Sequence, residues 1–137
     1  MQRCAVIFDM DGLMVDTEPL ARAAWATIVD QHGQTLTDDV YRQMIGRRTV
    51  ESAQLLLDRY ELPYTAVSLA AYKNELFAVR RAQGVPSMPG LMELVTAVAG
   101  RGLPWAVATS SPQEHAQVIL GQLGLQAACA AVAAGDE

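Results

Sequence analysis

The sequence predicts an α/β fold in which a block of helices interrupts a parallel sheet. Residues 4–8 form an uninterrupted apolar run that ends in the acidic loop Asp9-Met10-Asp11, as expected for a parallel strand covered on both faces. About seventy residues with helical periodicity and no strand signal follow. From residue 87 onward, helix and strand signals alternate, which is typical of parallel α/β units.

Four helices are expected in the inserted block. Threonine residues precede three of them at suitable N-cap positions, and glycine or proline residues mark where the helices end. The helices are expected over residues 18–33, 38–46, 50–60 and 66–83. The chain therefore divides into a helical segment, residues 17–86, and an α/β part made of residues 1–16 and 87–137.

The α/β part continues with alternating elements. A helix is expected over residues 91–102, a buried strand over 104–108 and a third strand over 130–134. Between the last two, Ser111 and Glu114 form a capping box around Pro112, so a further helix is expected to begin at Pro112 with Ser111 as its N-cap.

Composition narrows the possible functions. The formal net charge is −5, so nucleic acid is not an expected partner. No apolar run reaches the length of a membrane span and no signal peptide is recognisable, which predicts a cytoplasmic protein without membrane association. Cys4 and Cys129 lack metal-ligand spacing and are interpreted as buried, reduced residues.

Asp9 and Asp11 lie where ligands of open α/β sheets bind, just beyond the carboxyl end of a strand. Two carboxylates on one short loop repel each other unless a cation or a shared proton offsets their charge. Mg²⁺ binds through one or two such carboxylates together with substrate phosphate. Thr109 and Ser110 supply hydroxyl groups after the next core strand, beside a helix N-terminus, where anions bind. The pattern predicts Mg²⁺-dependent phosphate chemistry.

The motif that begins at Asp9, Asp-Met-Asp-Gly-Leu-Met-Val-Asp-Thr-Glu-Pro, closely resembles the first motif of the haloacid dehalogenase superfamily. The form is that of its β-phosphoglucomutase-like and sugar-phosphatase branch. The resemblance covers essentially the whole chain, because that family also has a Rossmann-like parallel-sheet core with a helical cap inserted after the first motif. It implies a four-helix cap at residues 17–86 and a discontinuous core at residues 1–16 and 87–137.

The resemblance also implies roles for individual residues. Asp9 would be the nucleophile that forms an aspartyl phosphate, and Asp11 would protonate the leaving oxygen and later activate water. Mg²⁺ would bridge the Asp9 carboxylate, the Asp11 backbone carbonyl and the phosphate. The phosphoryl oxygens would be held by the backbone N–H groups of Met10 and Asp11 and by Thr109 and Ser110.

The cap of the resembled family carries substrate specificity, so residues at its edge are candidates for substrate contacts. Glu18 lies at the junction of core and cap. Arg47 and Arg48 lie in a turn between cap helices, where a planar guanidinium suits a charged substrate. For each of the three the alternative interpretation is an ordinary surface residue. The expected substrate is a small phosphorylated metabolite whose identity the sequence does not give.

Two elements of the resembled family have no counterpart in this sequence. The family has a lysine after its third strand and acidic residues at its fourth, whereas the single lysine here, Lys73, falls in the cap. In a doubly wound sheet the first strand also needs a neighbour on each side. The core is therefore expected to be incomplete in this chain, and a C-terminal segment of the same protein is expected to complete it. The alternatives are a partner that supplies the remaining strands and an edge of the sheet that is exposed.

The leading interpretation is a Mg²⁺-dependent phosphatase, with the 137-residue chain alone expected to be inactive. A phosphosugar mutase of the β-phosphoglucomutase type is the first alternative. Ala21 and Thr49 stand where the resemblance would place the mutase's histidine and arginine, which favours the phosphatase. A catalytically inactive binding or regulatory module is the second alternative.

Overall fold

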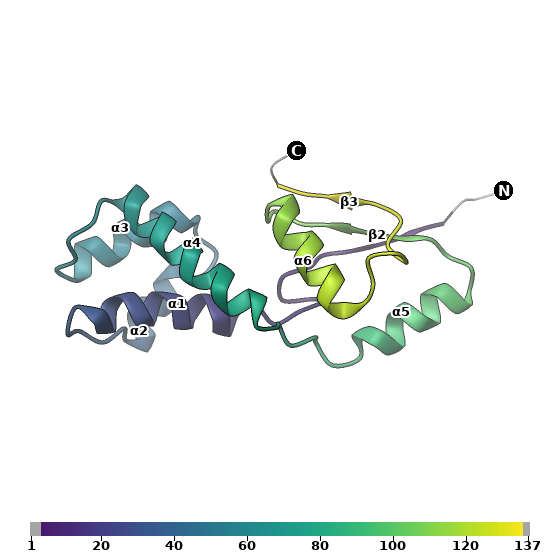
Figure 1. The fold of residues 1–137 in the computed structure, drawn as a ribbon, viewed down its shortest axis with the longest axis horizontal. Coiled ribbons are helices and arrows are strands. Elements are labelled where there is room, and N and C mark those ends of the chain that lie inside the picture. The colour runs from purple at the N-terminus through teal and green to yellow at the C-terminus, as the bar shows by residue number, and fades with distance from the viewer. Residues whose placement is uncertain (1–3, 136–137) are drawn as a thin grey trace. The chain divides into compact units, whose positions relative to one another are not determined.

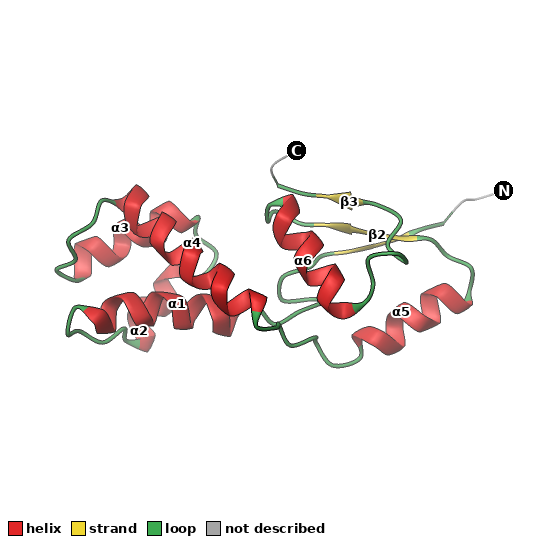
Figure 2. Cartoon of the chain, viewed as in Figure 1, coloured by secondary structure: helices red, strands yellow, loops and turns green. Residues whose placement is uncertain are grey.

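The computed structural model describes residues 4–135. Figure 1 shows the course of the chain, and Figure 2 separates helices from strands. The elements, in chain order, are β1 (Val6–Phe8), α1 (Glu18–Gln31), α2 (Asp38–Met44), α3 (Thr49–Arg59), α4 (Ala66–Ala82), α5 (Leu91–Gly100), β2 (Trp105–Ala108), α6 (Gln113–Leu123) and β3 (Val132–Ala133). This order confirms the predicted α/β fold with helices inserted after the first strand. Within the described residues, no helix has the length and apolar character needed to cross a membrane.

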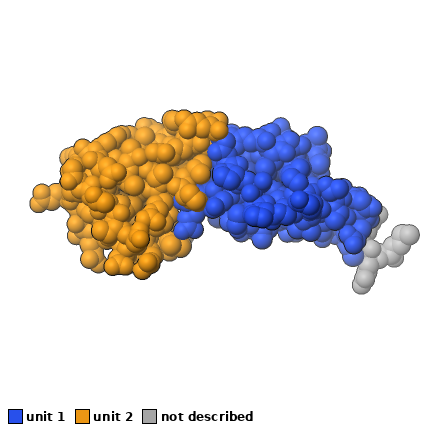
Figure 3. Space-filling view, turned by 90° about the horizontal axis from the view of Figure 1, so that it is seen from below, with its two compact units in different colours: residues 1–18, 84–137 blue, residues 19–83 orange. Residues whose placement is uncertain are grey.

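The chain forms two compact units, which Figure 3 shows in different colours. One consists of residues 1–18 and 84–137 and contains the sheet with α5 and α6; we call it the α/β unit. The other consists of residues 19–83 and contains α1 to α4 apart from the first residue of α1; we call it the helical unit. Each unit has its own cluster of buried hydrophobic side chains.

The α/β unit is built on a parallel sheet with the strand order β1-β2-β3. Residues 6–8 lie beside residues 105–107, and residues 107–108 lie beside residues 132–133. Parallel strands in this order bring their carboxyl ends, and the loops that follow them, to one edge of the sheet. Among the described residues β1 pairs only with β2, so it is an edge strand.

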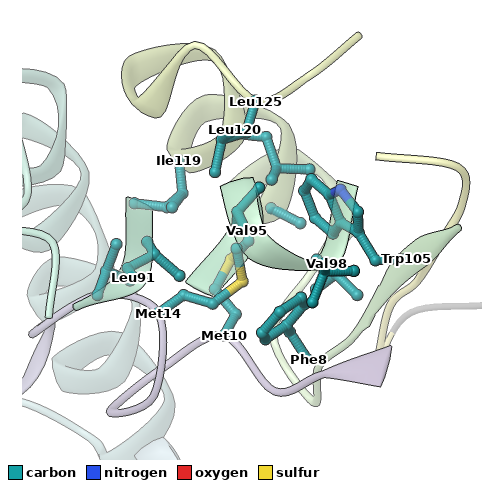
Figure 4. Packing of buried hydrophobic residues seen from close by; sticks show 13 residues of the cluster. Phe8, Met10, Met14, Leu91, Val95, Val98, Trp105, Ile119, Leu120 and Leu125 are labelled. Atoms are coloured by element: carbon teal, nitrogen blue, oxygen red, sulfur yellow. The ribbon is translucent and has the colours of Figure 1, made fainter. Parts of the chain in front are cut away.

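One face of the sheet packs against α5 and α6, as Figure 4 shows. Alternate strand residues point to this face because side chains alternate along a strand. Phe8 meets Trp105 there in an edge-to-face arrangement with ring centroids 5.6 Å apart. The rest of the cluster comes from the loop after β1, from α5, from β2 and from α6 with the residues that follow it: Met10, Met14, Val15, Leu91, Val95, Val98, Val107, Ala116, Ile119, Leu120 and Leu125.

The other side of β1 differs from the prediction. Ile7 is 69% exposed, and Cys4 is exposed as well, so the apolar run is not covered on both faces by the residues that the structure describes. The prediction that Cys4 is buried is therefore wrong, while Cys129 is half-buried. An apolar run at a strand predicts burial, but covering its second face needs elements that the described residues do not supply.

In the helical unit, α2 and α4 begin after the threonine residues that were predicted as N-caps. Thr37 accepts a hydrogen bond from the N–H of Val40 at the start of α2, and Thr65 accepts one from the N–H of Ser68 at the start of α4. Both contacts confirm the predicted N-caps. The buried hydrophobic residues of this unit are Ala24, Trp25, Ile28, Val29, Leu36, Tyr41, Met44, Ala53, Leu56, Leu69 and Ala70.

Two chain segments connect the units, and they pair with each other within the α/β unit. The N–H of Asp16 donates to the carbonyl of Pro86 at 2.9 Å, and the N–H of Met88 donates to the carbonyl of Met14 at 2.8 Å. Val15 and Ser87 form an antiparallel bridge between these contacts. The acidic loop after β1 is therefore tied directly to the segment that returns from the helical unit.

Candidate active site

The loop after β1 is held in place by its own apolar residues. Met10, Met14 and Val15 are completely buried, and the N–H of Met14 donates to the carbonyl of Met10 at 2.9 Å. Gly12 has φ of +81°, a left-handed conformation that residues with a side chain rarely adopt, so a glycine at this position suits the turn of the loop. Because these anchors fix the loop, the acidic side chains stay at the carboxyl end of β1.

Asp9 directly follows β1 and is exposed. Its Oδ1 accepts a hydrogen bond from the backbone N–H of Met10 at 2.9 Å. The sequence predicted that this N–H group faces a phosphate oxygen, whereas here it is engaged by the neighbouring carboxylate. An exposed carboxylate at a strand end is accessible to a ligand that approaches from solvent.

Asp11 is the centre of a polar cluster. Its Oδ1 accepts hydrogen bonds from Thr17 Oγ1 at 2.8 Å and from His115 Nε2 at 2.9 Å. Its Oδ2 accepts one from Ser111 Oγ at 2.7 Å and a long one from Thr109 Oγ1 at 3.5 Å. We call these four donors the Asp11 clamp. They come from the start of α1, the loop after β2 and the first turn of α6.

The clamp changes the acidity of Asp11. Burial raises the pKa of this carboxyl group, but hydrogen bonds from His115, Ser111 and Thr17 and the charge of His115 lower it by more. The net result lowers the pKa of Asp11 from 3.8 to about 2. In this arrangement Asp11 is therefore a carboxylate at neutral pH.

Three members of the clamp, Thr17, Ser111 and His115, were not predicted as site residues. The sequence interpretation makes Ser111 the N-cap of the following helix, and this is wrong: α6 begins at Gln113 with Pro112 at the N-cap position, while the Ser111 hydroxyl bonds Asp11. His115, in the first turn of α6, is 4% exposed. The spacing of Ser111 and His115 in the sequence could have indicated that both belong to the site. The two residues are four positions apart at the start of a helix, and helical side chains point back toward the N-terminus.

Thr109 and Ser110 follow β2 at the same edge of the sheet. The Thr109 hydroxyl accepts a hydrogen bond from the N–H of Ser111 at 3.1 Å, in addition to its long contact with Asp11. Ser110 is exposed, and its backbone lies directly against Gly135. Thr109 is thus close to Asp11 as the strand-end prediction implied, and phosphate binding by either residue stays a prediction.

The remaining predicted residues lie at the edge of the helical unit or within it. Glu18 is the exposed first residue of α1. Arg47 is exposed, and its Nε donates to the carbonyl of Gln43 at 2.6 Å beside a surface hollow of about 420 Å³ between α2 and α3. Arg48 precedes α3, and its N–H donates to Glu51 at 3.3 Å. Substrate contact by any of them stays a prediction.

A metal ion would find few protein ligands at this site. Over residues 4–135, no group of three or more His, Cys, Asp or Glu side chains is placed to hold a metal ion. The carboxylate of Asp11 is occupied by its clamp, which leaves the exposed Asp9 carboxylate and backbone carbonyls. This donor set fits Mg²⁺, which keeps several water ligands and needs only one or two carboxylates beside a phosphate.

Comparison with known families and proteins gives consistent matches. The family model of haloacid dehalogenase-like hydrolases matches residues 5–137. A phosphorylated carbohydrates phosphatase of Thermotoga maritima is 30% identical over 136 residues, which cover 97% of this chain and 62% of that protein. The fructose-1-phosphate phosphatase of Escherichia coli K12 is 32% identical over 131 residues, covering 96% of this chain and 69% of that protein.

Solved structures share the fold. A Thermotoga maritima protein, provisionally assigned as a β-phosphoglucomutase, superposes with a TM-score of 0.83 at 30% identity. The match covers 96% of this chain and 61% of that structure. The chain covers 62%, 50% and 69% of the length of three curated relatives, so it spans only part of each of them.

Proposed function

The chain belongs to the haloacid dehalogenase-like hydrolases, and from this premise we propose that it carries the nucleophile and the acid–base residue of a phosphatase for small phosphorylated metabolites. One observation carries the proposal. The exposed Asp9 carboxylate follows β1 directly, and Asp11, two residues later, is bonded by side chains from the loop after β2. Two strand ends thereby contribute to one polar site, where α/β proteins bind ligands.

In the proposed reaction an Asp9 oxygen attacks the substrate phosphorus. The bond between phosphorus and the ester oxygen breaks, and the leaving oxygen takes a proton from Asp11. A water molecule then attacks the aspartyl phosphate and gives a proton to Asp11, which restores Asp9 and releases inorganic phosphate. The first half of this sequence needs Asp11 to be protonated, whereas the clamped Asp11 is a carboxylate.

We propose that Asp9 and the backbone carbonyl of Asp11 hold Mg²⁺ together with the substrate phosphate. The ion would offset negative charge on the transferring group. Thr109 and Ser110 are the proposed hydroxyl ligands of the phosphoryl oxygens. Residues 17–86 are proposed as the cap, and Glu18, Arg47 and Arg48 as its substrate contacts. Phosphorylated carbohydrates, the substrates named for the Thermotoga maritima phosphatase, are the first class to test.

We also propose that the activity needs further strands beside β1. In support, Ile7 of this edge strand is 69% exposed, and the relatives are longer than this chain. The chain's single lysine, Lys73, lies in α4 of the helical unit over the rings of Trp25 and Phe77.

The test is hydrolysis of p-nitrophenyl phosphate and a panel of sugar phosphates with Mg²⁺. It compares the 137-residue chain with a chimera that adds the part of the Thermotoga maritima phosphatase left uncovered by the match. We expect turnover by the chimera, and turnover at least about 10²-fold slower by the chain alone, since removing even one electrostatic donor costs that much. Asp9→Asn should abolish turnover and beryllium fluoride binding by the chimera.

The second candidate is a phosphosugar mutase, favoured by the 30% identity to the Thermotoga maritima structure provisionally assigned to that activity. Product analysis separates the two, since a phosphatase releases inorganic phosphate and a mutase returns the phosphoryl group to sugar. Turnover by the Asp9→Asn chimera, or an inactive chimera that is folded and binds Mg²⁺, would contradict the proposed phosphatase.

A further inference from the structure

The hollow between α2 and α3 is formed by residues of the helical unit alone. Its volume of about 420 Å³ lies within the range of small-molecule sites, about 300–1,000 Å³. Glu51, Leu55 and Asp58 line it from α3, because spacings of four and three residues place them on one side of that helix. The hollow is therefore a feature of two neighbouring helices within one compact unit.

Two arginines of the hollow are held by one residue, Gln43 of α2. Arg47 Nε donates to the Gln43 carbonyl at 2.6 Å, and Arg59 donates through one terminal nitrogen to Gln43 Oε1 at 3.3 Å. A guanidinium carries several N–H donors, so each arginine keeps donors that these hydrogen bonds do not use. Two positive groups are thereby brought to the same side of the hollow, where an anionic group such as a carboxylate would be bound.

Two carboxylates line the same hollow. Asp58 Oδ1 accepts a hydrogen bond from Gln54 Nε2 at 2.9 Å. Glu51 Oε2 accepts one from the N–H of Arg48 at 3.3 Å. The other oxygen of each carboxylate accepts no hydrogen bond from residues 4–135. These two oxygens are open to a ligand that donates, such as an ammonium group.

The charged groups of the hollow do not neutralise one another. Within the part of the chain that the structure describes, its two arginines and two acidic residues form no ion pair with one another. Other arginines of the helical unit do pair, Arg22 with Asp38 and Arg42 with Asp39. Equal numbers of positive and negative groups remain available, which favours a ligand that carries both charges and no net charge. Leu55, half-buried in the same wall, offers an apolar contact.

We propose that this hollow binds a free α-amino acid with an apolar side chain. The carboxylate of the amino acid would meet Arg47 and Arg59. Its ammonium group would meet Asp58, and its side chain would lie on Leu55. A ligand with one charge fits less well, since it leaves the oppositely charged half of the hollow without a partner. The inference does not rest on the proposed function, because Arg59 and Asp58 have no part in the proposed reaction.

The test is an NMR titration of the 137-residue chain with L-leucine, followed through the backbone amides of residues 43–59 and the side-chain N–H groups of Gln43 and Gln54. We expect saturable shifts around the hollow with a dissociation constant of about 1–10 mM, since exposed charges are screened by salt. Two matched probes each lack one charge: isocaproate has no ammonium group, and isoamylamine has no carboxylate. Each should bind at least about tenfold more weakly than leucine, because hydrogen bonds to charged groups contribute that much.

Two substitutions test the assignment of the charges. Arg59→Gln and Asp58→Asn each remove one charge and keep a polar side chain, and each should weaken leucine binding at least about tenfold. Arg42→Gln is the matched control. Arg42 is an exposed arginine of α2 that pairs with Asp39 and does not line the hollow, so its replacement should leave leucine binding unchanged.

The absence of saturable shifts at residues 43–59 up to about 50 mM leucine would overturn the site. Isocaproate or isoamylamine binding as tightly as leucine would overturn the requirement for both charges. Parent affinity in Arg59→Gln or in Asp58→Asn would overturn the assigned contacts. Shifts confined to residues 9–11 and 109–111 would place leucine at the candidate active site and would also overturn the inference.

Discussion

Gly135, at the end of the residues that the structure describes, lies against the backbone of the loop after β2. A Cβ atom at this position would be 2.0 Å from the carbonyl oxygen of Ser110. The N–H of Gly135 also donates to the carbonyl of Ser111 at 2.9 Å, so the contact joins the end of β3 to the clamp loop. The absence of a side chain at residue 135 thus shapes the site.

We expect Gly135→Ala to lower the free energy of unfolding by about 1–3 kcal/mol, because backbone on both sides has to shift. Amide chemical shifts of residues 109–111 should change together with it. Gly121→Ala is the matched control, since a Cβ there meets nothing within 4 Å and the residue lies inside α6. This control should stabilise the chain by about 0.5–1 kcal/mol. Equal effects of the two variants would show that the contact at Gly135 is not close.

The second prediction at the residue scale concerns the stability of the folded chain at low pH. The pKa of Asp11 is lowered to about 2 in the folded chain, so the unfolded state binds more protons between that value and the ordinary one. Stability from the clamp is therefore complete above about pH 4 and is lost as pH falls toward about 2.

Urea unfolding of the parent and of Asp11→Asn, repeated across this range, isolates the contribution. We expect the difference in unfolding free energy between the two proteins to shrink by about 1–2 kcal/mol from about pH 5 to about pH 2. Asp58→Asn, at an exposed acidic residue bonded to Gln54, should show no such change. A difference that stays constant with pH would mean that the clamp does not hold the ionised form.

At the scale of elements, the sequence predicted the features that depend only on residues close together in the chain, such as helix starts and turns. Threonine caps at residues 37 and 65 fixed the starts of two helices, and the left-handed Gly12 turned the acidic loop. Contacts between distant segments were not predictable in this way. The strand-end rule placed Thr109 near Asp11, but it did not identify the donors Thr17, Ser111 and His115, which lie 6, 100 and 104 residues away in sequence and meet Asp11 only in the folded α/β unit. Ser111 matches the sequence pattern of a capping box, but in the structure its hydroxyl bonds Asp11 and does not cap α6.

The helical unit offers a prediction at this scale. Its core is formed entirely by its own residues, with Leu56 and Leu69 completely buried between α3 and α4. We expect residues 17–86 alone to fold into a helical domain with cooperative thermal unfolding, followed by circular dichroism. Leu56→Ala should lower its stability by about 2–5 kcal/mol through the cavity it leaves. The neighbouring Leu57, which is half-buried, should cost less when replaced. A non-cooperative transition of the parent segment would contradict the independence of this core.

At the scale of the whole chain, both units expose large apolar side chains, and one of those in the α/β unit lies on a strand at the edge of the sheet. Ile7 stands on an edge strand at 69% exposure, and Leu13 in the following loop is 52% exposed. Exposed edge strands pair with other chains unless charge, proline or a covering segment prevents it. β1 has none of these protections among its own three residues, Val6–Phe8.

The last prediction follows from this edge. We expect the 137-residue chain to associate reversibly at high micromolar concentration, because an unpaired row of N–H and C=O groups beside an apolar side chain is available to a second copy. Sedimentation velocity across a concentration series measures the association. Ile7→Lys should shift the chain to monomer, since a charge on an edge strand opposes pairing, while Val67→Lys, at a helix residue of equal 69% exposure, should leave the association unchanged. The chimera, whose added segment is proposed to cover β1, should be monomeric without any substitution. A parent chain that stays monomeric throughout the series would show that the β1 edge is protected by some other means. An equal effect of the two lysine variants would show that the association depends on general surface hydrophobicity and not on the β1 edge.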